Sequence, residues 1–571
     1  MTQSERMNGA EIVVRLLERQ GITSIAGIPG GAVLPFYDAL ARTGTIRHVL
    51  ARHEQGAGFI AQGMARVTGR PGVCVASSGP GATNLLTAIA DAKLDSIPLV
   101  AITGQVPRAM LGTDAFQEVD TFGLSLPITK HNVLVRSAQE LLEVIPRAFA
   151  IAASGRPGPV LIDVPKDVQT ESVDVAAWPE PGAAQALPAA DAQAIEHAAA
   201  MIESAQRPIL YLGGGIVHSG AAAAAVAVAE RSQLPTVMTL MGLGSMPVGH
   251  PLSLGMLGMH GAPYTNLALD ECDLLIAVGA RFDDRATGKL AEFCPRAAVI
   301  HVDIDAAELG KLRTAQLPIA ADALDVLERL LPRLRARPRT TWQARIRELK
   351  RSNPLVMPRL DSLASPYGLI RAVSAALPDD AIVTTDVGQH QMWVAQAFPL
   401  RRPRQWLTSG GLGTMGFGLP AAIGAALAAP ERTVVCFSGD GSILMNLQEL
   451  ATAAEEGVNV KIVLFNNRSL GLVHQQQTLF YEKRTYASTY RRTPDFAALT
   501  RAFGLTAVDL DRARDPAAAL AAALREPGPC LVHATIDTAE QVLPMVPPGA
   551  ANTQMIVRAD EDRAAPQRRL A

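Results

Sequence analysis

The chain has 571 residues, 48% of them hydrophobic, with 52 basic against 54 acidic side chains. This length exceeds what one hydrophobic core supports and predicts about three domains. The chain has no excess of positive charge to bind nucleic acid or an anionic membrane surface, so we expect neither as a partner. Residues 1–21 lack the apolar core of a signal peptide, and the five scattered cysteines contain no CxxC pair. We therefore predict a cytoplasmic protein with reduced core cysteines.

Short apolar runs typical of strands alternate with helical stretches along the whole chain, as in residues 72–76, 98–102, 208–212 and 274–278. This rhythm predicts an α/β fold with three doubly wound, parallel-sheet domains.

Two stretches interrupt the alternation. Residues 173–188 are rich in Pro and Ala, and residues 335–366 are charged and contain several prolines. We interpret both as linkers. They give domains at 1–175, 190–335 and 365–545, followed by a loop-like tail at 546–571.

Glu54 begins an apolar helix directly after the strand-like run 46–50. A carboxylate at this place commonly caps the first helical turn and needs no further role. Glycine-rich segments at 30–31, 78–84 and 104–105 of the same predicted domain favour a second interpretation, in which Glu54 is an acid facing a heterocycle. A buried carboxyl group facing a ring nitrogen can assist a proton transfer there.

The segment Gly439-Asp440-Gly441-Ser442 follows one strand-like run, and Asn467, 27 positions after Asp440, follows the next. Each piece alone is typical of a turn. Together they form one βαβ unit, which predicts Asp440 and Asn467 at the carboxyl ends of neighbouring parallel strands. Carboxylate and amide oxygens favour Mg²⁺, and flanking glycines let a phosphate approach. The pattern predicts a magnesium-bridged diphosphate and resembles the thiamine diphosphate (ThDP) signature of decarboxylases and carboligases. ThDP chemistry requires an acid at its pyrimidine ring, the role that the second interpretation of Glu54 provides.

The first and third predicted domains share a weak sequence similarity. Ser-Gly-Pro-Gly at 78–81 and Ser-Gly-Gly at 409–411 each lead into a helix and then a strand. Many βαβ units look alike, which is one explanation. The other is that two related domains each hold one end of a single cofactor.

From residue 8 to residue 550 the chain resembles the acetolactate synthase (acetohydroxyacid synthase) family of large catalytic subunits, in its bacterial isozyme I type. The resemblance implies decarboxylation of pyruvate on ThDP and transfer of the two-carbon unit to pyruvate or 2-oxobutyrate, which begins branched-chain amino acid synthesis. It also implies Mg²⁺ and FAD as cofactors, a homodimer or homotetramer, and a small regulatory subunit. The segments that carry it are 27–31, 52–56, 104–107, 113–118, 155–159, 164–167, 281–285 and 410–420.

The resemblance also implies roles for individual residues. Glu54 activates the cofactor, and the reacting carbonyls meet Gly31, Phe116, Gln117, Lys166 and Gln476. The metal ligands are Asp440, Asn467 and the carbonyl of Ser469. ThDP is contacted by Pro29, Glu54, Ser78, Asn84, Gly388, Gln389, His390, Gly413, Met415, Gly439, Gly441, Ser442, Gly471 and Leu472. FAD is contacted by Arg156, Gly214, Thr239, His260, Gly261, Arg281, Asp283, Arg285, Asp303 and Asp322.

Without the resemblance, several of these residues have simpler interpretations. Lys166 would be a surface lysine, Met415 would be ordinary core, and Gly213-Gly214-Gly215 would be a turn, since it lacks the GxGxxG spacing. One position departs from the family: many members carry tryptophan where this chain has Gln476. Because that ring helps to select the extra methyl group of 2-oxobutyrate, we predict only a weak preference for 2-oxobutyrate over pyruvate.

Two other functions fit the same motifs. A flavin-dependent pyruvate oxidase or a simple 2-oxo acid decarboxylase would use the same cofactor site. A catalytically silent scaffold is a third possibility, although the joint presence of Glu54, Asp440 and Asn467 argues against it.

Overall fold

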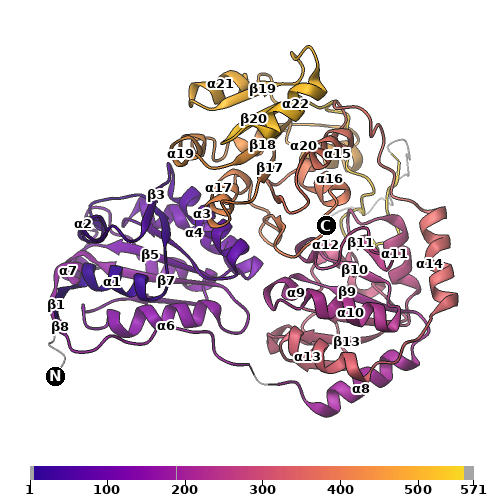
Figure 1. Ribbon diagram of the computed structural model, residues 1–571, viewed down its shortest axis with the longest axis horizontal. Helices are drawn as coiled ribbons and strands as arrows, with labels where there is room; N and C mark the ends of the chain where they lie inside the picture. The colour runs from indigo at the N-terminus through magenta and orange to yellow at the C-terminus, as the bar shows by residue number, and fades with distance from the viewer. Residues whose placement is uncertain (1–4, 188, 559–571) are drawn as a thin grey trace.

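The computed structural model describes residues 5–187 and 189–558. Three six-stranded parallel sheets follow one another along the chain, and a two-stranded antiparallel pair joins β1 (Glu5–Asn8) to β8 (Ser172–Val175). In Figure 1 the N-terminal domain is coloured indigo to purple, the central domain mainly magenta, and the C-terminal domain orange to yellow. The predicted fold of three doubly wound domains is confirmed, while the exact domain boundaries stay a prediction.

The N-terminal sheet has the strand order β3-β2-β4-β5-β7-β6. Its inner strands are buried on both faces, which explains their continuous apolar sequences. Val73 and Val75 of β4 join the core on one face, while Cys74 and Ala76 join the core on the other. The strands are β2 (Ser24–Gly27), β3 (Arg47–Leu50), β4 (Gly72–Ala76), β5 (Leu99–Gln105), β6 (His131–Leu134) and β7 (Pro159–Pro165). The helices are α1 (Gly9–Arg19), α2 (Leu34–Thr43), α3 (Glu54–Thr68), α4 (Pro80–Asp95), α5 (Thr121–Ser125), α6 (Leu141–Ala153) and α7 (Lys166–Thr170).

The central sheet has the order β11-β10-β9-β12-β13-β14, which is 3-2-1-4-5-6 in order of appearance. This order is typical of dinucleotide-binding domains, whose ligands lie where the direction of winding reverses. In this sheet that point lies between β9 and β12. The strands are β9 (Pro208–Leu212), β10 (Thr236–Met238), β11 (Ser253–Met256), β12 (Leu274–Val278), β13 (Ala298–Asp303) and β14 (Leu317–Ala320). The helices are α8 (Ala192–Ser204), α9 (Gly214–His218), α10 (Ala222–Ser232), α11 (Pro263–Glu271), α12 (Asp284–Thr287), α13 (Ala323–Leu330) and α14 (Thr340–Ser352).

The C-terminal sheet has the order β16-β15-β17-β18-β20-β19, and both outer sheets therefore share the order 2-1-3-4-6-5. The N-terminal and C-terminal domains, which share a weak sequence similarity, therefore also share one topology. The strands are β15 (Ile382–Thr385), β16 (Trp406–Leu407), β17 (Val434–Gly439), β18 (Val460–Asn466), β19 (Thr506–Asp509) and β20 (Cys530–Thr535). The helices are α15 (Pro366–Ala376), α16 (Gln389–Ala397), α17 (Gly418–Ala428), α18 (Asp440–Ile443), α19 (Glu449–Glu456), α20 (Gly471–Phe480), α21 (Phe496–Ala502) and α22 (Pro516–Arg525).

The outer domains pack through α3 and α17, which lie side by side in Figure 1. A Cβ atom added to Gly63 would lie 2.2 Å from the carbonyl oxygen of Ala421, and one added to Gly424 would lie 1.9 Å from that of Ile60. Only glycine allows the two helix backbones to approach so closely. This contact fixes the N-terminal domain against the C-terminal domain of the same chain.

The interpretation of residues 335–366 as a plain linker is wrong for part of the segment. Residues 340–352 form α14, which buries Trp342, Ile346 and Leu349 against the central domain. The Trp342 indole N–H donates to the carbonyl of Pro208 at 3.1 Å. The charged side chains cover the outer face of this amphipathic helix, and they dominate the composition of the segment.

Residues 546–558 of the predicted tail lie against the central domain. The N–H of Val546 donates to the carbonyl of Met259, and the Asn552 amide donates to the carbonyl of Ala286, both at 2.9 Å. The tail up to residue 558 therefore contacts the central domain, and its last part, 559–571, lies outside the described residues. All five cysteines are buried and free. Within the described part of the chain, none of the helices has the length and apolar character needed to cross a membrane.

Candidate active site and cofactor clefts

The predicted metal ligands lie together at the ends of two paired strands. Asp440 follows β17 and Asn467 follows β18, and the two strands pair as far as Gly439 and Phe465. Because Gly439 pairs with Phe465, Asp440 and Asn467 follow neighbouring positions of two adjacent strands.

The Asp440 carboxylate is 1% exposed, and its Oδ2 atom has no hydrogen-bond partner among the described residues. Burial raises the pKa of this carboxyl group to about 7. An unpartnered buried carboxylate oxygen is rare, because its desolvation goes uncompensated. Beside amide and carbonyl oxygens it fits a hard cation such as Mg²⁺.

A cradle without side-chain bulk lies beside these oxygens. A Cβ atom added to Gly439 would lie 2.9 Å from His390 Nδ1, and one added to Gly471 would lie 2.0 Å from Gln389 Oε1. Burial lowers the pKa of His390 to about 3, so the ring is neutral, and its Nε2 atom lacks a partner in the described chain. The predicted diphosphate residues are therefore gathered around a surface of glycine backbone, which suits a phosphate group.

The N-terminal residues form a second cluster. The cap of α3 is made by His53, whose Nδ1 accepts the N–H of Gln55 at 3.1 Å, so Glu54 is not needed for this interaction. Instead, Glu54 Oε2 accepts a hydrogen bond from the Asn84 amide at 2.9 Å. A Cβ atom on Gly81 would lie 3.5 Å from Glu54 Oε1. The helix-cap interpretation of Glu54 is thus replaced by a contact with α4.

Gln117 belongs to the same cluster. It packs on Gly79, where an added Cβ would lie 2.9 Å from Gln117 Cα, and Gly79 has a φ of 57°. Glu118 organises the preceding loop, because its carboxylate accepts the backbone N–H groups of Gly112, Thr113 and Ala115. Phe116 is 87% exposed in the single chain, whereas Lys166 begins α7 and is half-buried.

A cleft of about 540 Å³ lies between the three domains. Gly261 is the one predicted flavin residue that does not line it, because it packs in a tight turn against Leu257 and Gly258. Gly413, Leu472 and Gln476, predicted for the ThDP side, line it as well. The nine predicted flavin residues that line the cleft are Arg156, Gly214, Thr239, His260, Arg281, Asp283, Arg285, Asp303 and Asp322.

The floor of the cleft is the switch point of the central sheet. A Cβ atom on Gly213 would lie 2.0 Å from the carbonyl oxygen of Gly279, so the turns after β9 and β12 cross at backbone distance. Burial raises the pKa of Asp303, at the end of β13, to about 6. Asp322 caps α13 by accepting two backbone N–H groups, so its carboxylate already has a structural role. This geometry favours a dinucleotide.

Comparison with known proteins identifies the family. Models of thiamine pyrophosphate (TPP) enzymes match the chain three times: the N-terminal TPP binding domain at 7–124, the central domain at 195–330, and the C-terminal TPP binding domain at 386–534. The chain is 60% identical to the acetolactate synthase isozyme 1 large subunit of Escherichia coli K12, over 97% of this chain and 98% of that protein. The chain belongs to the acetolactate synthase family.

Other acetolactate synthases match over similar lengths. The isozyme 2 large subunit of the same E. coli strain is 50% identical over 96% of this chain and 99% of its own. The acetolactate synthase large subunit of Corynebacterium glutamicum is 46% identical over 96% and 90%. The predicted family and the predicted ThDP-dependent enzyme class are confirmed. Glu54 lies in the first matched domain and Asp440 in the last.

Sequence reasoning missed several residues of these sites. Tyr490 covers Gly441, where an added Cβ would lie 2.7 Å from its hydroxyl oxygen. Gln475 accepts a hydrogen bond from Gln389 at 2.9 Å and so orients the diphosphate cradle. Asp386 accepts the N–H of Gly416 at 2.7 Å. The only sequence feature that could have indicated Gln475 is its polar side chain within helix α20. No local sequence feature indicates the contacts of Tyr490 and Asp386.

Proposed function

We propose that this chain is an acetolactate synthase that decarboxylates pyruvate and joins the two-carbon unit to a second 2-oxo acid. With pyruvate as the acceptor the product is 2-acetolactate, and with 2-oxobutyrate it is 2-aceto-2-hydroxybutyrate. The observation that carries this proposal is the unpartnered Asp440 oxygen beside a glycine cradle, in a chain 60% identical to a synthase over nearly its full length.

The cofactors follow from the two clefts. ThDP, when bound, supplies an electron sink for the carbanion that decarboxylation leaves. Asp440 Oδ2, the Asn467 amide oxygen and the Ser469 carbonyl would hold Mg²⁺, and the glycines at 439, 441 and 471 would admit the diphosphate. We propose FAD in the cleft of about 540 Å³, because the strand order and the crossed glycine turns there suit a dinucleotide.

Glu54 would hold and release a proton at its Oε1 atom. The Asn84 amide fixes the other oxygen, Oε2, and so sets the direction of the carboxyl group. Because Gly81 has no side chain, the space in front of Oε1 stays open for a ring nitrogen. A positioned acid of this kind contributes about 10²- to 10⁴-fold to a proton transfer.

Gln117 would donate its amide to the developing oxyanion of the substrate, since its backbone is fixed by Gly79 and the Glu118-bound loop. Lys166 and Gly31 would contact the substrate carboxylate and carbonyl. Phe116 would exclude water from the reacting carbon, yet it is 87% exposed in one chain. We therefore propose that a second copy covers Phe116, giving at least a homodimer.

Within the described chain, no hydrogen bond joins Glu54, Asn84 or Gln117 to the metal residues. A homodimer in which Glu54 of one copy faces the diphosphate cradle of the other is consistent with this separation. The relatives' names include "large subunit", and we propose that a small regulatory subunit binds this chain too.

One incubation with pyruvate, ThDP, Mg²⁺ and FAD tests the proposed reaction. Acetolactate formation without O₂ uptake supports it. O₂ uptake would indicate a flavin-dependent oxidase, and acetaldehyde as the main product would indicate a decarboxylase. ThDP binding without pyruvate turnover would indicate a silent scaffold. A colourless but fully active protein would contradict the proposed flavin.

A further inference from the structure

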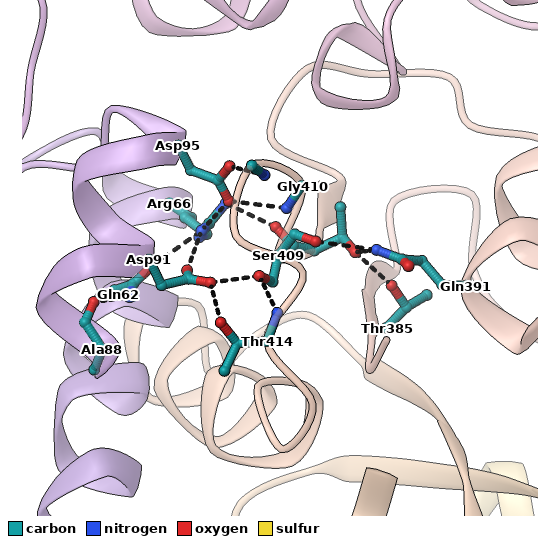
Figure 2. A network of polar contacts seen from close by, with 12 residues as sticks. Gln62, Arg66, Ala88, Asp91, Asp95, Thr385, Gln391, Ser409, Gly410 and Thr414 are labelled. Carbon is teal, nitrogen blue, oxygen red and sulfur yellow. Dashed lines mark hydrogen bonds and ion pairs between the residues drawn. The ribbon is translucent and has the colours of Figure 1, made fainter. Parts of the chain in front are cut away.

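A buried polar cluster joins the N-terminal domain to the C-terminal domain (Figure 2). It contains two carboxylates and one guanidinium: Asp91 and Asp95 on α4, and Arg66 on α3. Their side chains are between 0% and 5% exposed, and Arg66 binds Asp95 at 2.8 Å and Asp91 at 3.3 Å. Fully desolvated charges of this kind are costly unless every partner is in place. We call these three residues the clasp.

The clasp holds a glycine-rich loop of the other domain. Asp95 accepts the backbone N–H groups of Gly410 at 3.1 Å and Gly411 at 2.7 Å. Asp91 accepts the hydroxyls of Ser409 and Thr414, the latter at 3.0 Å. Figure 2 shows Asp91 and Asp95 reaching this loop from one helix. Because four of the eight residues at 409–416 are glycine, the loop has little conformational preference of its own.

This loop contributes residues to both proposed cofactor sites. Ser409, Gly410 and Gly411 line the cleft proposed for FAD, together with Asp95 itself. In sequence, the loop continues directly into Met415, which is predicted to contact ThDP.

The C-terminal end of the loop is linked by hydrogen bonds to β17, the strand that precedes Asp440. The N–H of Gly416 donates to Asp386 Oδ1 at 2.7 Å, and the hydroxyl of Ser438 donates to Asp386 Oδ2 at 3.4 Å. Ser438 lies two residues before Asp440. An unbroken series of contacts therefore runs from the clasp to the residues proposed to hold Mg²⁺.

We propose that Arg66, Asp91 and Asp95 are positioning residues that hold the 409–414 loop in the conformation both cofactors require. This inference rests on the proposed placement of FAD and ThDP. The clasp residues belong to the N-terminal domain of the same chain. The conformation of the loop at the proposed flavin site therefore depends on how the two outer domains pack. Cofactor binding measured at each site tests this role directly.

The variant Thr414→Val removes one hydroxyl that donates to Asp91 and keeps the shape of the side chain. Thr414→Ser restores the hydroxyl, and Thr500→Val is the matched control, because the Thr500 hydroxyl donates at 2.7 Å to a carbonyl of its own helix. We expect Thr414→Val to weaken FAD binding by about tenfold, the usual effect of losing a hydrogen bond to a charged group. Thr414→Ser and Thr500→Val should bind FAD within about twofold of the unchanged protein.

Four quantities should be measured for each protein: the FAD dissociation constant, the visible absorption band of bound FAD, the dissociation constant of ThDP with Mg²⁺, and the thermal midpoint. A weaker FAD constant and an altered flavin band in Thr414→Val, rescued by Thr414→Ser, support the clasp. A lowered midpoint with wild-type constants and band would overturn it, because the residues would then be merely structural.

A second pair of variants guards against poor folding. Asp91→Asn should weaken the binding of both FAD and ThDP. Asp163→Asn is the control, because Asp163 is an equally buried carboxyl group bound to Thr103 and Gln105, and it should weaken the binding of neither cofactor. Equal effects in the two variants would overturn the inference. If the unchanged protein binds no FAD, the flavin part of the proposed function fails, and the ThDP constant of Thr414→Val alone then decides about the clasp.

Discussion

The two outer domains share one strand order but present different carboxylates at the ends of their strands. In the N-terminal domain Glu54 is half-buried and bound to Asn84. In the C-terminal domain Asp440 is buried and leaves one oxygen without a partner in the described chain. Topology is therefore common to both domains, and the chemistry of each depends on how its carboxylate is partnered.

This difference supports the two roles proposed above, a proton-transferring acid in the N-terminal domain and a metal ligand in the C-terminal domain. A carboxylate oriented by an amide, with one face open, can exchange a proton with a ring. A buried carboxylate oxygen without a donor is stabilised by a cation instead. The following variants test this division of roles, from the largest expected effect to the smallest.

Glu54→Gln keeps the size and the Asn84 contact of the side chain but removes its exchangeable proton. We expect an intact fold and C2 proton exchange of bound ThDP slowed by about 10²- to 10⁴-fold. Hydrogen–deuterium exchange of the cofactor, followed by NMR, measures this rate. Undiminished exchange would remove Glu54 from the mechanism.

Asp440→Asn should weaken Mg²⁺-dependent ThDP binding by about 10²-fold, because the neutral amide is a poorer ligand for a hard cation. Titration calorimetry with ThDP at several Mg²⁺ concentrations measures the effect. Asp509→Asn is the control, since both Asp509 oxygens are already bound, to His533 and to Arg512. Equal losses in the two variants would show that Asp440 holds no metal.

Gln476→Trp tests the predicted contact of Gln476 with the acceptor substrate. Gln476 lines the same cleft as the proposed flavin residues. An aromatic surface for the extra methyl group should raise the preference for 2-oxobutyrate over pyruvate by about tenfold, the value of one methylene in an apolar pocket. The ratio of the two products under competing acceptors measures it. Val473→Trp, on the same helix at a position 48% exposed, should leave the ratio unchanged. An unaltered ratio in Gln476→Trp would contradict the assignment.

Asp163 is a buried carboxyl of the N-terminal sheet whose two oxygens are both bound, to Thr103 and Gln105. Burial raises its pKa from 3.8 to about 7. The folded protein therefore holds the proton that the unfolded chain releases, so stability should fall as pH rises from about 4 to about 7, by at most about 1.4 kcal/mol per pH unit.

Asp163→Asn should remove this dependence, because the amide stays neutral at every pH. Urea unfolding at pH 5 and pH 8 measures the apparent free energy of unfolding for both proteins. We expect the variant to lose less stability between the two pH values than the unchanged chain does. Parallel pH profiles would contradict a raised pKa for the Asp163 carboxyl group.

Local patterns were sufficient to place the candidate site residues at helix starts and strand ends. The start of α3 at Glu54 and the positions of Asp440 and Asn467 after neighbouring parallel strands agree with the sequence predictions. These features depend on spacing within one βαβ unit, which the sequence states directly. The α14 helix was missed because its charged outer face dominates the composition, and its apolar stripe is narrow.

The sequence by itself determined the alternation of strands and helices, the glycines at the strand ends, and the type of each carboxylate. Only the tertiary structure decided that Asp91 and Asp95 hold the loop at 409–414, more than 300 positions away in the chain. It also decided that Tyr490 covers Gly441 and that His53, not Glu54, caps α3. Contacts between domains depend on how whole helices such as α3 and α17 pack together, and no local spacing of residues records that arrangement.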